Sequence, residues 1–549
     1  MFDKMHAIVR LELYLLPTSY LLLPTLLKVS FTLFRKMRNI AMNHRLKRLG
    51  CLIAACLMLT GCAAQESAGT SAQLTLPPAQ YRHAAPENDM SQDYEQAVVL
   101  YLPSLDGTKL LAVPQNAVLS ASRQRSRTLC EMLLAHPGTE AAAPVGGNVN
   151  LALSDTDPVE VSGQVVTVSL AASALRLSHE QLFTVGQAIA NTLGQFGDVA
   201  YVNVLISGAQ PGMNIAATLP AGCYQPNSRE DLSALWARAS APLSSARRSF
   251  AAALYYPAPS GKGILCEART LSFTASDLSG MAVTLLEALS AGAEALPNVP
   301  RCPELASFLR GTPTLSESGG VRRLVLRFSE DLNSALINAG ITRSVMMASL
   351  CWTLTTFLPG IEGIEIHIGS ERVNTLTPSG TYNGAGEIIT FQDGLMRRRD
   401  FSGFLLEECA LYFANAQGKL EKTYRPIPYY EAASARALVE QLMLGPQPYD
   451  SKSGLSAVLP GGLRSADLLG VGFQDKTLLL NFSAQLVALA KDMDGEKEAL
   501  LIYSLVNTVC QLPGVKRAAL YVQGSQPDSL AGAIYLPGDF LPNTDMVSE

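Results

Sequence analysis

The sequence has few of the residues and none of the spacings from which catalytic or metal sites are usually built. Only six of its 549 residues are histidine, and neither Cys-x-x-Cys nor His-x₃-His spacing occurs, so nothing indicates a metal site. Ser-x-x-Lys, Gly-x-Ser-x-Gly, a Walker phosphate loop and Gly-x-Gly-x-x-Gly are missing as well. Acyl and nucleotide chemistry therefore have no local signature, and we predict that the protein is not an enzyme and holds no cofactor or metal.

Charged residues are also scarce, at 16% of the chain, and they are unevenly placed. Residues 1–61 carry nine Lys or Arg and two acids, a net charge of +7, which leaves −12 for residues 62–549. Apolar residues make up 48%, which argues against disorder over most of the length. Because phosphate binding needs a basic surface, the acidic body excludes nucleic acid as an expected partner.

The basic front end has the pattern of a membrane-targeting signal. Residues 42–61 combine a cationic start with an apolar stretch that is too short to span a bilayer, and they end in Leu-Thr-Gly before Cys62. This pattern resembles a bacterial lipoprotein signal peptide. The resemblance implies that Cys62 is acylated, becomes the mature N-terminus and anchors the chain by lipid to the extracytoplasmic face of the cell membrane.

The residues on either side of this signal have different explanations. A lipoprotein signal should begin near its own Met, so residues 1–41 are either a mis-assigned extension, with translation starting at Met42 or Met37, or a real N-terminal anchor. We favour the first, since a second anchor would leave the signal without a purpose. Residues 62–94 are rich in Ala, Ser, Gln and Pro, and we expect a flexible tether.

The remainder contains three related units. Each opens with a tyrosine-led strand, continues with a helix that shares a Leu-x-Glu-x-Leu core, and closes with a helix running into a last strand. The spacing from a helix Thr to a closing Gly is 16 residues each time, between Thr192 and Gly208, Thr353 and Gly369, and Thr508 and Gly524. We therefore predict α+β architecture, with three tandem small domains that each have a short sheet packed by two helices. The predicted ranges are 95–215, 250–370 and 405–530, with a C-terminal tail at 531–549.

The third unit carries the resemblance to a known family. It contains ALVEQLMLGP, SGLSAVLPGGL, LLLNFSAQL and VNTVCQLPGVKRAALYVQG in this order. This set resembles the GerM domain, the sporulation and spore-germination domain of bacterial lipoproteins. The first unit keeps Thr192-x-x-Gln195 but lacks the Leu-Pro-x-Gly turn, and the middle unit is a degenerate copy with Thr356 in place of the Gln. The resemblance implies a non-catalytic extracytoplasmic domain, similar in shape to ring-building modules of envelope assemblies.

Two groups of residues within the units are candidates for a chemical role, which is acid–base catalysis for the glutamates and a disulfide for the cysteines. Glu131, Glu287 and Glu440 recur at one helix position; three copies at one position favour a structural cause over acid–base catalysis. Cys266 and Cys302 fall in predicted loops of one unit, which leaves a disulfide between them open. The cysteines on apolar helix faces are expected to be buried small hydrophobes; they are Cys130, Cys351 and Cys510.

Two functions from different classes follow. The leading hypothesis is a lipid-anchored, non-catalytic scaffold or assembly protein of the bacterial envelope, with sporulation or germination as its more specific version and envelope or sporulation proteins as partners. The alternative is a solute- or glycan-binding lipoprotein that serves a transporter or a wall enzyme, in which Trp236 and Trp352 would have to stack on sugar. The sequence leaves the identity of the partners and the oligomeric state open.

Overall fold

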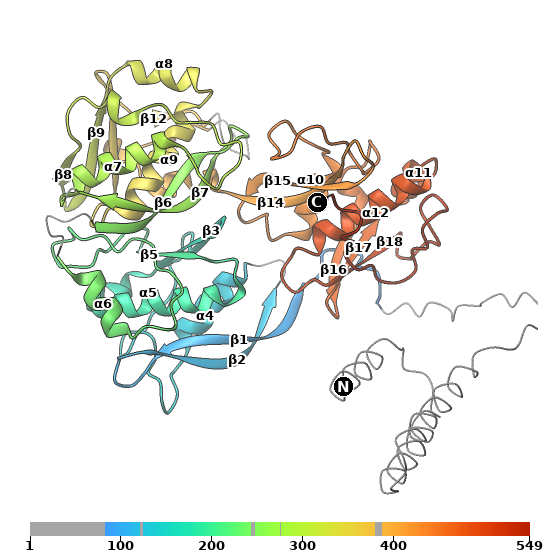
Figure 1. Ribbon diagram of the computed structural model, residues 1–549, viewed down its shortest axis with the longest axis horizontal. Coiled ribbons are helices and arrows are strands. Elements are labelled where there is room, and N and C mark those ends of the chain that lie inside the picture. Colours follow the sequence, from blue (N-terminus) through green and yellow to red (C-terminus); the bar gives the residue numbers. More distant parts are fainter. Residues whose placement is uncertain (1–82, 121–123, 243–247, 275, 379–386, 549) are drawn as a thin grey trace, which may run out of the picture. The chain divides into compact units, whose positions relative to one another are not determined.

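The computed structural model describes residues 83–120, 124–242, 248–274, 276–378 and 387–548. These residues form three copies of one arrangement, which follow one another along the colour gradient of Figure 1 and which we call units 1, 2 and 3. Each copy has a hairpin, a helix, two antiparallel strands, a short helix, a 15-residue helix and a last strand. The last strand pairs in parallel with the strand before the short helix. The predicted α+β fold class is confirmed.

Unit 1 has the three-stranded sheet order β3–β4–β5 beside a separate hairpin. The hairpin strands pair over their whole length, from Asp93 with Ser120 to Pro103 with Leu110. Its elements are β1 (Asp93–Pro103), β2 (Leu110–Ser120), α4 (Arg125–Ala135), β3 (Val159–Ser162), β4 (Val165–Leu170), η2 (Ala172–Arg176), α5 (His179–Leu193), η3 (Gly194–Phe196), β5 (Tyr201–Ile206) and the connecting α6 (Leu232–Ser240).

Unit 2 is the most elaborate copy, because its sheet has a fourth strand and the order β11–β10–β9–β8. Its core elements are β6 (Arg248–Pro257), β7 (Ile264–Phe273), α7 (Leu278–Ala291), η4 (Leu305–Phe308), β8 (Thr314–Ser318), β9 (Val321–Phe328), α8 (Asp331–Asn338), α9 (Arg343–Phe357) and β10 (Gly363–Ile368). The additional elements are β11 (Glu371–Arg372), β12 (Thr375–Leu376), β13 (Ile389–Thr390), η5 (Gln392–Gly394) and η6 (Arg398–Phe404).

Unit 3 repeats the plan of unit 1, with the sheet order β16–β17–β18. A bulge between Leu468 and Gly470 is the one register shift in the pairing of β16 with β17. Its elements are β14 (Leu406–Ala414), β15 (Leu420–Pro428), α10 (Ala435–Met443), η7 (Ser465–Asp467), β16 (Leu468–Gln474), β17 (Thr477–Phe482), α11 (Gln485–Ala490), α12 (Gly495–Val509) and β18 (Arg517–Val522).

The helices form where the sequence provides caps and an apolar face. The side chains of Ser178, Thr342 and Asp494 each accept a backbone N–H in the first turn of the long helix that follows. On the shorter helices, the second leucine of each Leu-x-Glu-x-Leu core is fully buried, as expected for a residue one helical turn after the first leucine on the same face. They are Leu133, Leu289 and Leu442.

The shared interval of 16 residues conceals a difference in the middle unit. Strand β5 ends 14 residues after Thr192, whereas β10 ends 15 residues after Thr353. As a result Gly369 directly follows its strand, while Gly208 stands one residue further on. Both glycines have positive φ, at 64° and 81°, so each makes the turn that leaves the sheet.

The described residues of the predicted tether, from His83 onward, are not a free linker. A flexible tether was expected over residues 62–94, but the described part packs on the sheet of unit 3. The carbonyl of His83 accepts the Tyr521 hydroxyl at 3.0 Å, and the carbonyl of Pro86 accepts Asn481 Nδ2 at 2.8 Å. Hydrogen-bonded backbone and a covered apolar face explain why this stretch is ordered despite its composition.

The predicted C-terminal tail is likewise part of unit 3. Phe540 pairs with Ala518 in β18, as Tyr224 pairs with Val202 in β5 of unit 1. Asn507 and Asn543 exchange side-chain and backbone hydrogen bonds of 2.9 and 3.1 Å, which hold this returning segment.

The predicted signal peptide and extension, together with Cys62 and tether residues 62–82, lie outside the described residues. Within the part that the structure does describe, no helix has the length and apolar character needed to cross a membrane.

Candidate functional site

The Thr-x-x-Gln pattern joins the long helix of unit 1 to its hairpin, and in unit 3 Gln511 alone makes such a bond, from its Nε2 to the Ala410 carbonyl at 3.0 Å. In unit 1, Thr192 Oγ1 accepts the N–H of Tyr101 at 3.1 Å. Gln195 accepts the N–H of Val99 at 2.9 Å and donates to its carbonyl at 3.1 Å. The motif is therefore a structural clamp that fixes the hairpin against the helix.

The middle unit uses the same positions differently. Thr353 still accepts a backbone N–H, that of Tyr255, at 3.0 Å. Thr356, however, replaces the Gln and accepts a hydrogen bond from the guanidinium of Arg398. The same guanidinium forms an ion pair with Glu160 of unit 1, and both side chains are only 7% exposed. Thr356, at the position where the other units have Gln, therefore helps to hold the arginine that connects unit 2 to unit 1.

The surroundings of Arg398 keep it charged. Its guanidinium carbon lies 3.6 Å from the ring centroid of Trp352 and 5.5 Å from that of Tyr255. Burial works against the charge, but the carboxylate of Glu160 and the hydrogen bonds around it hold the pKa of Arg398 above its ordinary value. Trp352 is fully buried, so it cannot stack on a sugar.

A second junction joins all three units at the turn between β3 and β4. The hydroxyl of Ser162 donates to the carbonyl of Leu406 in unit 3 at 2.7 Å and accepts the N–H of Cys266 in unit 2 at 3.0 Å. The next residue, Gly163, donates its N–H to Glu407 Oε2 at 2.8 Å. Gly163 has φ 59°, and a Cβ there would lie 3.2 Å from the Cys266 carbonyl, so the turn requires glycine.

Beside this junction, units 1 and 3 enclose a cleft of about 450 Å³. Unit 1 contributes the start of α4 and the segment after α5, and unit 3 contributes β14, β15 with the segment after it, and the segment after α12. Gln124 ties the two walls together, since its Nε2 donates to the Tyr429 carbonyl at 3.2 Å. The charged and aromatic side chains that line the cleft are Arg125, Phe196, Asp198, Glu407, Glu408, Tyr424 and Tyr429.

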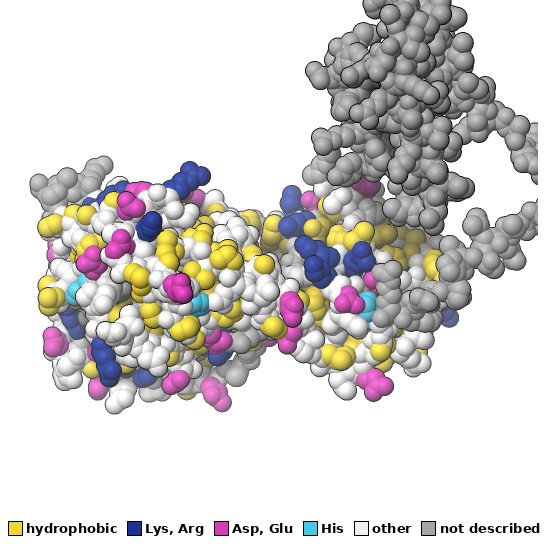
Figure 2. Space-filling view, turned by 90° about the horizontal axis from the view of Figure 1, so that it is seen from below, with side chains coloured by type: hydrophobic (Ala, Val, Ile, Leu, Met, Phe, Trp, Pro, Cys, Tyr) yellow, Lys and Arg dark blue, Asp and Glu magenta, His cyan; other side chains and the backbone are white. Residues whose placement is uncertain are grey.

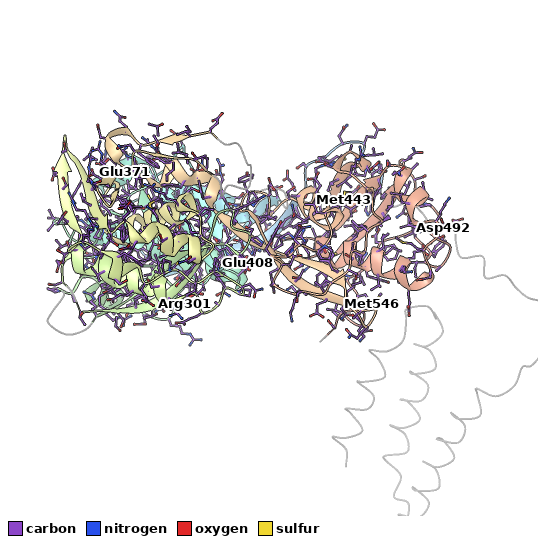
Figure 3. All side chains as sticks on the ribbon, turned by 90° about the horizontal axis from the view of Figure 1, so that it is seen from above. Arg301, Glu371, Glu408, Met443, Asp492 and Met546 are labelled. Carbon is purple, nitrogen blue, oxygen red and sulfur yellow. The ribbon has the colours of Figure 1, made fainter. Side chains whose placement is uncertain are left out.

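The charges in this cleft are not balanced. Arg125 is already engaged, because it pairs with Asp198 and its guanidinium carbon lies 4.1 Å from the Phe196 ring centroid. Burial raises the pKa of Glu407 to about 8, the Gly163 N–H lowers it less, and the charges of Glu408 and Asp198 raise it further. Burial also raises the pKa of Glu408. Figure 3 labels Glu408 on β14.

The repeated glutamates lie on helix surfaces, away from both junctions. Glu131 pairs with Arg127 at 3.1 Å, and Glu440 pairs with Arg436 at 3.8 Å, each one helical turn away. Glu287 is exposed on α7. Nothing brings these three glutamates together.

The histidines and cysteines are equally scattered. His179 opens α5 and His367 pairs with Glu365, while no group of three His, Cys, Asp or Glu side chains among the described residues could hold a metal ion. Cys266 and Cys302 are both buried free thiols, so the disulfide that the sequence left open is not formed. Cys266 lies in strand β7 and not in a loop, as the sequence had suggested. Of the helix cysteines, Cys130 and Cys351 are buried and Cys510 is half-buried.

Sequence reasoning missed Arg398, Glu160, Ser162 and Glu407. All four act across unit boundaries, where no repeat or motif relates the partners. One signal was present: the middle unit departs from the repeat at the two positions that contact Arg398, which are Trp352 and Thr356. The charge distribution on the face shown in Figure 2 does not indicate a binding site either. On this face, acidic and basic side chains are interspersed with uncharged ones.

The comparisons with known proteins identify the class of the third unit. Residues 410–528 match the Germane family model, described as sporulation and spore germination. Unit 3 is a domain of this family, as its sequence predicted. The comparison with curated proteins gives no match.

Three solved structures from two bacteria are similar to parts of this chain. The tandem GerMN domains of the sporulation protein GerM from Bacillus subtilis share 19% identity over 51% of this chain and 92% of theirs, with a TM-score of 0.20. The first GerMN domain of that protein shares 22% identity over 25% of this chain and 98% of its own, with a TM-score of 0.21. A protein described as a lipoprotein of Clostridium perfringens shares 22% identity over 25% and 87%, with a TM-score of 0.18.

Proposed function

We propose that this protein is a lipid-anchored, extracytoplasmic and non-catalytic assembly protein of the bacterial envelope that acts in sporulation or spore germination. The observation that carries the proposal is the family match of residues 410–528. The buried contacts between units support it, because Arg398 with Glu160 and Ser162 with Leu406 fix separate helix and sheet surfaces relative to one another. Such a fixed set of surfaces suits a protein that positions partners.

The proposed role is tested by deleting the gene in the source organism. We expect fewer heat-resistant spores or slower germination, restored by the wild-type gene. Normal counts of both, in a strain confirmed to lack the protein, would contradict a sporulation role.

The proposed anchor is tested separately at Cys62. A fatty-acid probe added to growing cells should label the wild-type protein and leave Cys62→Ala unlabelled. Equal labelling of the two proteins would exclude Cys62 as the anchor. The start site can be checked in the same strain: with the Met1 codon changed to a stop, expression should persist from Met42 or Met37.

A solute-binding lipoprotein is the second candidate function. The cleft of about 450 Å³ between units 1 and 3 favours it, since its volume lies in the range of small-molecule sites. It would bind its ligand through the charged and aromatic lining of that cleft, and not through tryptophan.

A further inference from the structure

Unit 2 carries a row of basic side chains across the outer face of its sheet, the face opposite the buried Phe328. Arg327 of β9 pairs in parallel with His367 of β10, and His367 pairs with Arg372 of β11. On the other side of Arg327 lies Arg310, whose N–H donates to the Arg327 carbonyl at 2.7 Å. Because residues opposite one another on neighbouring strands project to the same face, these four side chains form one line, which we call the basic row.

The basic row is short of negative charge. Glu365 lies on the same face, but its carboxylate already pairs with the histidine of the row at 2.7 Å and with Arg323 at 3.1 Å. Glu371, labelled in Figure 3, is directed to the other face by strand alternation and pairs with Arg343 at 3.5 Å. The three arginines of the row are exposed, and none of them forms an ion pair with a carboxylate among the described residues. Like charges directly opposite one another are destabilising, so the row favours a bound anion.

The matching sheet positions of units 1 and 3 are covered by protein. In unit 3 the central Arg and His of the row are replaced by Asn481 and Tyr521, which pair in parallel in the same register. Asn481 Nδ2 and the Tyr521 hydroxyl each donate to a backbone carbonyl of residues 83–90, at 2.8 and 3.0 Å. In unit 1 the matching residues, Ser169 and Leu205, are buried. Among the described residues, the basic row is therefore the uncovered copy of a surface that binds a protein segment in unit 3.

The chain itself has few acids left that could neutralise the row. Of the longer stretches that the structure does not describe, residues 379–386 contain no Asp or Glu. Residues 1–82 contain three acids, which are far apart in the sequence: Asp3, Glu12 and Glu66. Neighbouring strands lie about 4.8 Å apart, so the row extends over about 14 Å, the length of about four residues of extended chain. An acidic segment of that length has to come from another molecule.

We propose that the basic row binds a linear acidic segment of a partner protein, whose carboxylates pair with Arg310, Arg327 and Arg372. Guanidinium groups suit this ligand because each can donate two parallel hydrogen bonds to one carboxylate. A protein segment is favoured over a phosphate polymer because unit 3 accepts protein at the matching positions. The proposal rests on the assembly role proposed above, for which it names the chemistry of the partner, but its test needs no sporulating cell.

The direct test follows the fluorescence anisotropy of a labelled octapeptide of alternating Asp and Glu as the purified full chain is added. We expect saturable binding that weakens by about tenfold in the double variant Arg310→Gln with Arg327→Gln and by about threefold in Arg372→Gln. The same peptide with Asn and Gln in place of the acids should not bind. The matched control is Arg176→Gln, which removes an exposed arginine from unit 1 and should bind as the wild type does.

Melting temperatures separate a binding role of the arginines from a structural one. Because Arg327→Gln relieves the repulsion between two facing arginines, the variant should melt at or above the temperature of the wild type when no peptide is present. Saturating peptide should raise the melting temperature of the wild type and leave that of the double variant unchanged. A clearly lower melting temperature of peptide-free Arg327→Gln would show that this arginine stabilises the fold, and it would contradict the proposal.

Four binding results would also overturn the proposal. They are no saturable binding of the acidic peptide to the wild type, equal binding of its amide counterpart, equal binding by the wild type and the double variant, and equal weakening by Arg176→Gln. Inorganic polyphosphate that bound the row more tightly than the peptide would assign this face to a phosphate polymer. A dimer of the full chain, detected by analytical ultracentrifugation and dissociated by Arg327→Gln, would assign it to a second copy.

The failure of this proposal can be distinguished from the failure of the sporulation role. A chain that does not bind the peptide contradicts the basic row as a docking site, whatever the spore count of the deletion strain. A normal spore count contradicts the sporulation role, whatever the affinity for the peptide.

Discussion

The guanidinium of Arg398 lies over the indole ring of Trp352, with 3.6 Å between the guanidinium carbon and the ring centroid. Trp352 precedes Thr353 as Asn191 precedes Thr192 in unit 1. Asn191 bonds to both backbone groups of Asn227, which returns along the sheet. In unit 2 the larger ring instead supports an arginine that reaches Glu160 of unit 1, so the departure from the repeat creates an interface between units.

Removing Arg398 should destabilise the joint between units 1 and 2. Arg398→Ala leaves the buried carboxylate of Glu160 without its partner, at a cost of about 3–5 kcal/mol in the free energy of unfolding. Differential scanning calorimetry should show a lower melting temperature and separate transitions. The double variant Arg398→Met with Glu160→Met, which removes both charges, should be clearly more stable than Arg398→Ala. If Arg398→Ala melted like the wild type, the ion pair would not hold the units together.

A glutamine at the fourth position of the Thr-x-x-Gln pattern should stabilise the protein in unit 1 and destabilise it in unit 2. Gln195→Ala removes two hydrogen bonds to Val99 and should cost about 1–3 kcal/mol. Thr356→Gln would restore the family residue, yet it should also destabilise the protein because the longer side chain occupies the space of Arg398. Chemical denaturation of both variants measures these effects. A stabilising Thr356→Gln would show that Arg398 has room to move aside.

The repeat was predictable because local patterns specify it. Each of these patterns lies within about twenty consecutive residues, so it can be recognised in one stretch of the sequence. They are the helix caps, the Leu-x-Glu-x-Leu core and the closing helix and strand. The burial of Leu133, Leu289 and Leu442 follows directly from their helical spacing.

The candidate site was not predictable, because it depends on pairs far apart in the chain. Ser162 and Leu406 are 244 residues apart, and Glu160 and Arg398 are separated by 238. No periodicity relates such residues, and the cleft exists only after the units pack. Composition also misled the prediction for residues 83–90, since a polar, proline-containing stretch is ordered here by contacts with a distant sheet.

The protein should lose stability as Glu407 ionises. The pKa of this carboxyl is raised from an ordinary value of 4.5 to about 8 in the folded state, so the folded protein binds more protons than the unfolded chain between these values. Its free energy of unfolding should therefore fall as pH rises from 5 to 8, by roughly 3 kcal/mol from this group. Melting curves of Glu407→Gln should lack this part of the decrease. Parallel curves for the variant and the wild type across this range would contradict the raised pKa.

The leucines and the glutamates of the repeated Leu-x-Glu-x-Leu helices should have opposite effects when changed. Leu289→Ala opens a cavity under α7 at a side chain that is fully buried, and it should cost about 2–5 kcal/mol in the free energy of unfolding. Glu287→Gln, two residues earlier on the exposed side of the helix, should change stability by less than about 0.5 kcal/mol and leave activity in cells intact. Calorimetry and a spore count on the same strains measure both effects. If a Glu→Gln change at position 131, 287 or 440 abolished function while melting temperature and membrane amount stayed normal, a catalytic role would replace the assembly role.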